Sequence, residues 1–229
     1  MKFVGFIPAR SGSKGIKEKN LVNLSGRPLI NFTIDAALLS KKIDTIFISS
    51  DSSKILSCTN EDKVKKIKRP LEFSGDNASA NDVIKHFISL DIYKDYAGIY
   101  MVYLQPTSPL RNFNHINQAI TAFKKSRSSC LISVKPSSEL PFKSFKLKNS
   151  KLTPLFNEES LTSNRQELPK TFYPNGAIYI FSIDAFISNN YQLPLNDCTP
   201  FIMSQSDSID IDSHFDLKIA EEILNSKSI

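Results

Sequence analysis

Few cysteines and no long apolar stretch set the first limits on this chain. Its 229 residues include three cysteines, which are far apart and odd in number: Cys58, Cys130 and Cys198. None of them forms a CxxC pair, so a disulfide framework or a zinc site is not expected. No apolar run approaches the roughly 20 residues that a membrane span needs. The short apolar run at residues 3–7 indicates a buried strand rather than a signal peptide. We therefore expect a cytoplasmic protein with no membrane partner.

Several familiar nucleotide-binding and nucleic-acid-binding motifs are missing as well. The sequence contains neither GxxxxGK[ST] nor GxGxxG, and no RNP-like, zinc-finger or helix-turn-helix pattern is apparent. Its aromatic residues mostly occupy core-like positions rather than a basic face. The net charge of +6 still favours anionic partners. We therefore expect small phosphorylated or carboxylated substrates and no nucleic-acid partner.

The periodicity of apolar residues predicts an α/β domain with a mostly parallel, doubly wound sheet. A hydrophobic fraction of 41% and a charged fraction of 23% are ordinary for a globular protein. We expect strands at residues 2–7, 45–50, 64–68, 99–104, 130–135 and 177–181. We expect helices at residues 28–40, 81–93, 113–125 and 214–224, with Ser79 and Asp82 forming a capping box.

Residues 136–172 break this alternation. They are rich in Lys, Ser, Asn and Pro and show weak periodicity. The segment is either a long excursion that carries short strands or a partly mobile arm, and long irregular segments inside compact domains are often functional. The sequence shows no internal repeat and no low-complexity linker. We therefore expect one domain, residues 1–229, with an inserted arm at 136–172.

The segment after the first expected strand is the most informative. It reads PARSGSKG at residues 8–15 and is followed by Lys19 and Asn20. Ligands of open α/β sheets bind beyond the carboxyl ends of the strands. Gly12 and Gly15 allow the backbone to approach an anion closely, and Arg10 adds positive charge. The segment therefore favours phosphate binding, with a flexible basic turn as the alternative.

Two further segments carry weaker signals of the same kind. Arg69 precedes a turn of small residues at the start of an expected helix, and an arginine can bond a pyrimidine carbonyl. Gln105 opens the sequence QPTSPLR directly after the strand at 99–104. Two prolines stiffen that loop, so its polar groups are held at low entropic cost. The alternative for this loop is a rigid turn that caps the next helix.

Asp210 and Asp212 are the candidate metal ligands. If residues 208–212 form a strand, the two side chains point to the same face. Like carboxylates repel each other unless a cation or a proton intervenes, and Mg²⁺ typically takes one or two carboxylates plus substrate phosphates. The alternative is that both aspartates simply begin the last helix.

Arg165 in the polar arm and Asn175, just before a strand, complete the set of candidates. An arginine can bind a carboxylate bidentately, but an exposed arginine without a ligand is the alternative here.

Taken in order, these segments resemble the acylneuraminate cytidylyltransferases. The resemblance covers nearly the whole chain and rests on IPARSGSKG, RP with DNAS, LQPTSPLR, NGAIY and DIDS. It implies a Rossmann-like nucleotidyltransferase fold and a homodimer. It also implies a reaction in which CTP and an acidic 2-keto sugar give a CMP-sugar and pyrophosphate.

The resemblance also implies roles for individual residues. Arg10, Ser13 and Lys19 would hold the CTP phosphates, and Asn20 would contact the ribose. The residues around cytosine would be Arg69, Ala78 and Ser79. Asp210 and Asp212 would bind Mg²⁺, for which Mn²⁺ can substitute. The sugar would be bound by Gln105, Lys143, Arg165 and Asn175, with Lys143 and Arg165 acting across the dimer interface that the arm forms.

Some positions depart from the family pattern. No proline precedes Lys19, Ala80 stands where a serine can occur, and His214 follows the aspartate pair. These departures make legionaminic or pseudaminic acid realistic alternatives to sialic acid. Two further alternatives remain: a Kdo or sugar-1-phosphate nucleotidyltransferase, and a non-catalytic nucleotide- or RNA-binding protein.

Overall fold

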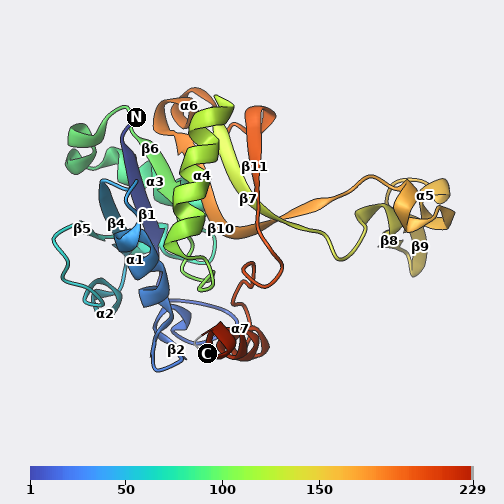
Figure 1. Ribbon diagram of the computed structural model, residues 1–229, viewed down its shortest axis with the longest axis horizontal. Coiled ribbons are helices and arrows are strands. Elements are labelled where there is room, and N and C mark those ends of the chain that lie inside the picture. Colours follow the sequence, from blue (N-terminus) through green and yellow to red (C-terminus); the bar gives the residue numbers. More distant parts are fainter. Residues whose placement is uncertain (228–229) are drawn as a thin grey trace.

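A computed structural model describes residues 1–227 and contains a central seven-stranded sheet with helices on both faces (Figure 1). The strands, in chain order, are β1 (Phe3–Pro8), β4 (Thr45–Ser50), β5 (Val64–Lys68), β6 (Tyr100–Tyr103), β7 (Cys130–Pro136), β10 (Phe172–Ser182) and β11 (Cys198–Ile202). Their order across the sheet is β11-β7-β10-β6-β1-β4-β5. Strand β10 runs antiparallel to both its neighbours, and every other pairing in this sheet is parallel. The predicted mostly parallel α/β sheet is therefore confirmed.

The strand predictions are correct for β4 and β5 and miss β11. The predictions for 45–50 and 64–68 match β4 and β5 in full. Strand β11 was not predicted. It contains Pro200, it pairs only with β7, and it has no fully buried residue, so its sequence lacks the usual signal. Residues 208–212, for which a strand was one of two alternatives, form no strand.

Four helices cover the two faces of the sheet. Helices α1 (Leu29–Leu39) and α4 (Phe113–Ser126) pack on one face, and α3 (Ala80–Ser89) and α6 (Ile183–Ser188) on the other (Figure 1). Each face has its own apolar core, so the sheet is buried on both sides. On the α3 side, the rings of Phe47 and Phe87 lie 4.9 Å apart. The longer of the remaining helices, α7 (His214–Lys227), packs near the hairpin of β2 (Asn23–Leu24) and β3 (Arg27–Pro28), and α2 (Ser53–Leu56) is a single turn.

The predicted helix at 81–93 is shorter than expected. Helix α3 ends at Ser89 because Leu90 adopts an extended conformation, and a 3-10 turn, Asp91–Tyr96, follows. The expected capping box is confirmed: Asp82 N–H donates to Ser79 Oγ at 3.2 Å, and Ser79 N–H donates to Asp82 Oδ2 at 3.0 Å. Among residues 1–227, no helix combines the length and apolar character needed to cross a membrane.

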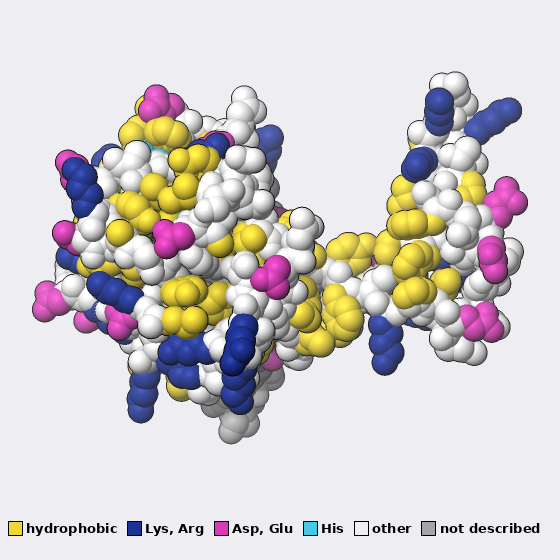
Figure 2. Space-filling view, turned by 90° about the horizontal axis from the view of Figure 1, so that it is seen from above, with side chains coloured by type: hydrophobic (Ala, Val, Ile, Leu, Met, Phe, Trp, Pro, Cys, Tyr) yellow, Lys and Arg dark blue, Asp and Glu magenta, His cyan; other side chains and the backbone are white. Residues whose placement is uncertain are grey.

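The chain between β7 and β10 projects from the body as an arm (Figures 1 and 2). It carries a hairpin of β8 (Phe145–Lys148) and β9 (Lys151–Pro154), followed by the short helix α5 (Glu158–Thr162). Of the two alternatives for residues 136–172, this arrangement corresponds to the long excursion that carries short strands. Figure 2 shows hydrophobic side chains gathered on the arm, and several of them are exposed: Phe145, Leu147, Leu152, Leu155 and Phe156.

Candidate active site

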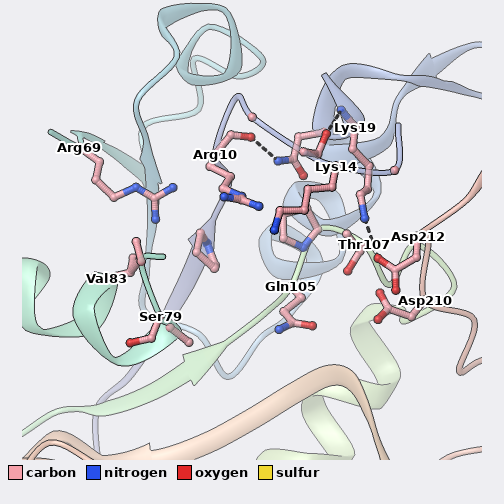
Figure 3. Close-up of a pocket in the computed structure, with 18 of the residues that line it drawn as sticks. Arg10, Lys14, Lys19, Arg69, Ser79, Val83, Gln105, Thr107, Asp210 and Asp212 are labelled. Atoms are coloured by element: carbon pink, nitrogen blue, oxygen red, sulfur yellow. Dashed lines mark hydrogen bonds and ion pairs between the residues drawn. The ribbon is translucent and has the colours of Figure 1, made fainter. Parts of the chain in front are cut away.

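A cavity of about 480 Å³ lies beyond the carboxyl ends of β1 and β6 (Figure 3). It is lined by four of the five candidate segments. The lining residues are Pro8, Arg10, Gly12, Ser13, Lys14, Gly15, Lys19, Asn20, Arg69, Ala78, Ser79, Ala80, Val83, Tyr103, Gln105, Pro106, Thr107, Asp210 and Asp212. The structure thus brings together ten of the thirteen residues that the sequence singled out. In Figure 3, Arg69 and Ser79 lie at one end and the two aspartates at the other, with Arg10, Lys14 and Gln105 between them.

The loop after β1 is held in shape by its own polar side chains. Asn20 donates from Nδ2 to the Arg10 carbonyl at 2.8 Å. Ser13 accepts from Lys19 N–H at 3.2 Å and donates to the Ile16 carbonyl. Ser13 and Asn20 therefore shape this loop, because both of their side chains are engaged with its backbone.

Gly15 lets this loop pack directly against the segment that carries the aspartates. A Cβ atom at Gly15 would lie 2.1 Å from the carbonyl oxygen of Asp212, whereas a Cβ at Gly12 would meet nothing within 4 Å. The contact is backbone on backbone, so no flexible side chain can give way. Glycine at position 15 thus sets the width of this end of the cavity.

We expect Gly15→Ala to destabilise the protein, because the loop and the Asp212 segment must separate to admit the methyl group. Overpacking of this kind costs about 1–3 kcal/mol, and each kcal/mol corresponds to roughly 2–4 °C in Tm for a chain of this size. Thermal unfolding measures the effect. Gly12→Ala is the matched control in the same loop, with an unchanged Tm expected. Equal Tm values for the two variants would contradict the role of Gly15.

Two cations in the middle of the cavity, Arg10 and Lys14, are paired with the carboxylate of Asp76. Arg10 Nη1 lies 2.9 Å from Asp76 Oδ1 and also donates to the Gly75 carbonyl at 3.1 Å. Lys14 Nζ lies 3.9 Å from the other oxygen of Asp76. These pairs are exposed, and exposed pairs are weak. Arg10 and Lys14 can therefore exchange Asp76 for a more highly charged anion.

Arg69 lies at the end of the cavity that is far from the two aspartates. Its side chain is buried, its Nε donates to Ser74 Oγ at 3.1 Å, and its guanidinium faces the cavity (Figure 3). Burial lowers the pKa of Arg69, and the Asp51 carboxylate opposes that shift. Ala78, Ser79 and Val83 line the cavity beside it. A buried guanidinium flanked by small side chains suits a flat ring with carbonyl acceptors.

Asp210 and Asp212 both reach the cavity, although not for the predicted reason. They lie in a loop without regular secondary structure, and Ile211 between them is buried in the apolar cluster that includes Ala220 of α7. Burial raises the pKa of Asp210, a hydrogen bond from Thr107 opposes this shift, and the neighbouring Asp212 carboxylate adds to it. Asp210 Oδ1 is buried and has no hydrogen-bond partner among residues 1–227. Helix α7 begins only at His214, so neither aspartate starts it.

Lys19 is engaged with the second of these aspartates. Its Nζ lies 2.7 Å from Asp212 Oδ1 and 2.8 Å from the Ile211 carbonyl (Figure 3). The described residues contain no cluster of three or more His, Cys, Asp or Glu side chains that could hold a metal ion. Two carboxylates with an unsatisfied buried oxygen still fit Mg²⁺, which draws its other ligands from water and phosphate. The donor set therefore suits a metal that arrives with a phosphorylated substrate.

Gln105 is placed by an irregularity in β10. The pairing of β10 with β7 shifts register between Pro174 and Tyr179, which makes a bulge next to the cavity. Within this bulge Gly176 has a φ of +75°, and a Cβ there would lie 2.4 Å from Gln105 Oε1. Glycine is needed at 176 both for the backbone conformation and for the space that Gln105 occupies.

Three predicted sugar-binding residues do not line this cavity. Asn175 is 3% exposed, accepts from Ser133 Oγ at 2.6 Å and donates to Ser208 Oγ at 2.8 Å, so it joins the bulge to β7 and to the loop before Asp210. Lys143 and Arg165 lie in the arm, where they donate to the Ser163 carbonyl at 2.6 Å and the Ser138 carbonyl at 2.7 Å. Within one chain these three side chains have other partners.

Sequence reasoning also missed lining residues. Tyr103, Val83 and Thr107 face the cavity, but they read as core or turn positions in the sequence. Tyr103 ends β6 and Thr107 follows two residues after Gln105, so the rule that ligands bind at carboxyl strand ends could have found both.

The location of the cavity decides the class of protein. Nucleotides bind beyond the carboxyl ends of parallel strands. The cavity at the carboxyl ends of these strands is lined by several cations and by a pair of carboxylates. The fold is that of the Rossmann-like nucleotidyltransferases. Residues 4–200 match the family described as "Cytidylyltransferase", and the chain belongs to that family.

Curated relatives are similar over nearly the whole chain. An N-acylneuraminate cytidylyltransferase of Escherichia coli is 31% identical over 228 residues, which are 99% of this chain and 53% of the relative. One of Streptococcus agalactiae is 33% identical over 226 residues, which are 94% of this chain and 52% of the relative. The chain thus spans about half the length of these relatives. A pseudaminic acid cytidylyltransferase of Campylobacter jejuni is 29% identical, with 96% of this chain and 95% of the relative covered.

Solved structures share the fold at low identity. A CMP-2-keto-3-deoxy-manno-octonic acid synthetase complexed with CTP gives a TM-score of 0.71 at 15% identity and covers 99% of this chain and 100% of that one. A 2-C-methyl-D-erythritol 4-phosphate cytidylyltransferase of Francisella tularensis gives 0.67 at 16% identity, with 97% and 100% covered. At these identities the likeness concerns the fold alone.

Proposed function

We propose that this chain transfers CMP from CTP to the anomeric hydroxyl of an acidic nine-carbon 2-keto sugar and releases pyrophosphate. The observation that carries the proposal is a single cavity with a buried arginine at one end, cations in the middle and a carboxylate pair at the other end. Similar relatives bear the names of N-acylneuraminate and pseudaminic acid cytidylyltransferases, which supports an acceptor of this class. CTP is a cytoplasmic metabolite, so we place the reaction in the cytoplasm.

In this proposal the nucleotide lies along the cavity from Arg69 toward Lys19. Arg69 donates to the cytosine ring, and Ala78 and Ser79 leave room for it. Asn20 contacts the ribose. Arg10, Lys14 and Lys19 surround the triphosphate, with the backbone of the loop that Ser13 holds. Gln105 orients the acceptor sugar at the end of the cavity near the aspartates.

The attacking group is the anomeric hydroxyl of the sugar, and pyrophosphate leaves from the α-phosphorus of CTP. No protein nucleophile is needed, so positioning and charge stabilisation supply the catalysis. Arg10 and Lys19 stabilise the negative charge that develops on the phosphate oxygens. Asp210 and Asp212 would hold Mg²⁺, or Mn²⁺ in its place, which when bound neutralises phosphate charge and can lower the pKa of a hydroxyl group.

Pyrophosphate release from CTP tests the proposal. The acceptor panel contains N-acetylneuraminic, legionaminic and pseudaminic acids, with Kdo as the control sugar. Release with one of the three nine-carbon acids and not with Kdo is the expected result. Release with Kdo alone would show that the acceptor is not a nine-carbon acid. No release with any sugar, despite CTP binding, would overturn the proposed transferase activity.

We propose further that the chain acts as a homodimer through its arm. Leu147 and Leu152 are directly opposite each other on β8 and β9 and are 74% and 64% exposed. Exposed apolar groups gathered on one projecting element are typical of an interaction surface. The other copy's arm would then bring its Lys143 and Arg165 to the acceptor end of the cavity.

We expect the double variant Leu147→Glu/Leu152→Glu to be a monomer, because it places two charges in the proposed interface. Light scattering after size exclusion measures the mass, with 25.7 kDa expected for one chain and twice that for the unchanged protein. Leu39→Glu is the matched control, since Leu39 is an exposed leucine on α1 of the body. A monomeric wild type, or a double variant that stays dimeric, would rule out the arm as the interface.

A further inference from the structure

Arg111 is a fully buried cation directly behind the cavity. It ends the loop that Gln105 begins, and it is only 1% exposed. Its Nε donates to the Ala177 carbonyl at 3.2 Å, and its Nη2 donates to Thr33 Oγ1 at 2.7 Å and to the Gln105 carbonyl at 3.1 Å. Within residues 1–227 no carboxylate forms an ion pair with it, and its Nη1 is buried without a hydrogen-bond partner.

A charge in this environment is costly to the fold. Burial lowers the pKa of Arg111 to about 9, and no opposite charge offsets that shift. Apolar residues of similar volume often replace buried charges without loss of stability. Neutral hydrogen bonds could also satisfy the three oxygens that Arg111 bonds. Fold stability alone therefore does not account for an arginine at this position.

The three acceptors of Arg111 come from three separate elements. Thr33 lies on α1, Gln105 follows β6, and Ala177 lies in the bulge of β10. Gly176, the residue before Ala177, is the one whose missing Cβ makes room for Gln105 Oε1. Arg111 thus bonds the carbonyl of Gln105. It also bonds the carbonyl of Ala177, which follows the glycine that makes room for the Gln105 side chain.

We propose that Arg111 is a positioning residue for the acceptor sugar: it fixes Gln105 against the β10 bulge and places an unneutralised positive charge behind the acceptor end of the cavity. Arg111 itself does not line the cavity, so it acts through Gln105 and through its field. A carboxylate-bearing acceptor is the ligand class that such a charge favours. The inference rests on the proposed function, since it assigns Gln105 to the sugar.

The test compares Arg111→Met and Arg111→Lys with the unchanged enzyme. Methionine removes the charge and the donors, so Gln105 loses its support and the acceptor loses the positive charge behind it. We expect the KM of this variant for the acidic sugar to rise about tenfold or more, which corresponds to about 1.4 kcal/mol. The Kd for CTP should stay within about twofold, because the nucleotide lies toward Arg69. Lysine keeps the charge and should recover part of the acceptor KM. Ser40→Ala removes another buried hydrogen bond, to Asn117 at 2.8 Å between α1 and α4, and controls for general loosening.

A separate measurement keeps this inference distinct from the proposed function. Hydrogen–deuterium exchange of peptides that cover residues 105–111 and 175–178 should be faster in Arg111→Lys and Arg111→Met, with β4 and β5 unchanged. If the unchanged enzyme turns over no sugar, the proposed function fails while the exchange result still decides the positioning role. The role is overturned if exchange at 105–111 is unaltered. It is also overturned if the acceptor KM is unaltered, or if the acceptor KM and the CTP Kd rise together.

Discussion

Replacing Lys19 with alanine is expected to lower the rate of CMP transfer by about 10²–10³, the usual loss when one preorganised donor to a transition-state charge is removed. Lys19 is suited to this role because its side chain is only 13% exposed and its Nζ is held at the aspartate end of the cavity by Asp212 and the Ile211 carbonyl. In water-excluded surroundings a fixed ammonium stabilises developing charge more strongly than it does in bulk water.

Initial rates of pyrophosphate release at saturating CTP and acceptor measure the effect. Lys17→Ala is the matched control, because Lys17 is an exposed lysine of the same loop that does not line the cavity. The control should turn over at the unchanged rate and exclude a general effect of net charge. Turnover of Lys19→Ala within a factor of two of the unchanged enzyme would sink its assignment as a catalytic residue.

Asp212→Asn is expected to move the magnesium dependence of the reaction to higher concentration by at least tenfold, roughly the effect of 1.4 kcal/mol on a binding equilibrium. The substitution removes one of the two carboxylates that line this end of the cavity among residues 1–227. It also frees Lys19, whose Nζ now lies 2.7 Å from Asp212 Oδ1. The amide oxygen that replaces the carboxylate is a weaker ligand for a hard cation.

The measurement is the initial rate as a function of Mg²⁺ concentration at fixed CTP. Asp216→Asn is the control, since Asp216 caps α7 through Ser213 and does not line the cavity. Asparagine retains an oxygen for that cap, so the midpoint of the control should not move. An unchanged titration for Asp212→Asn would count against a metal-ligand role, and Arg10, Lys14 and Lys19 would then have to balance the phosphate charge.

Local patterns predicted the parts of this protein that depend on local chemistry. An apolar run located β4, and the capping box located the start of α3. The rule that ligands bind at the carboxyl ends of strands predicted binding sites in the loop after β1 and at Gln105, and both line one cavity in the structure. These features succeed because neighbouring residues determine them, and because parallel strands must end at a common edge.

The features that failed depend on contacts distant in sequence. Asn175 reads as a polar residue next to a site, yet Ser133 and Ser208 enclose it completely. Arg111 ends the QPTSPLR loop in the sequence, and in the structure its hydrogen bonds to α1 and β10 hold it in the interior. The two aspartates share a cavity because Ile211 between them is buried in the apolar cluster that includes Ala220 of α7, and no strand is involved. A single sequence carries no signal for such pairings, so only the folded chain reveals them.

The antiparallel strand β10 has a consequence for how the chain is assembled. It lies between β6 and β7, which do not pair with each other, so residues 1–171 contain the four strands from β6 to β5 and the single strand β7, with no strand of this sheet to join them. During synthesis from the N-terminus both pieces carry an open inner edge, the kind of edge that invites wrong partners. Addition of β10 closes both edges at once. The same step brings Gly176 beside Gln105, so this part of the cavity does not exist until β10 has joined β7 to the rest of the sheet.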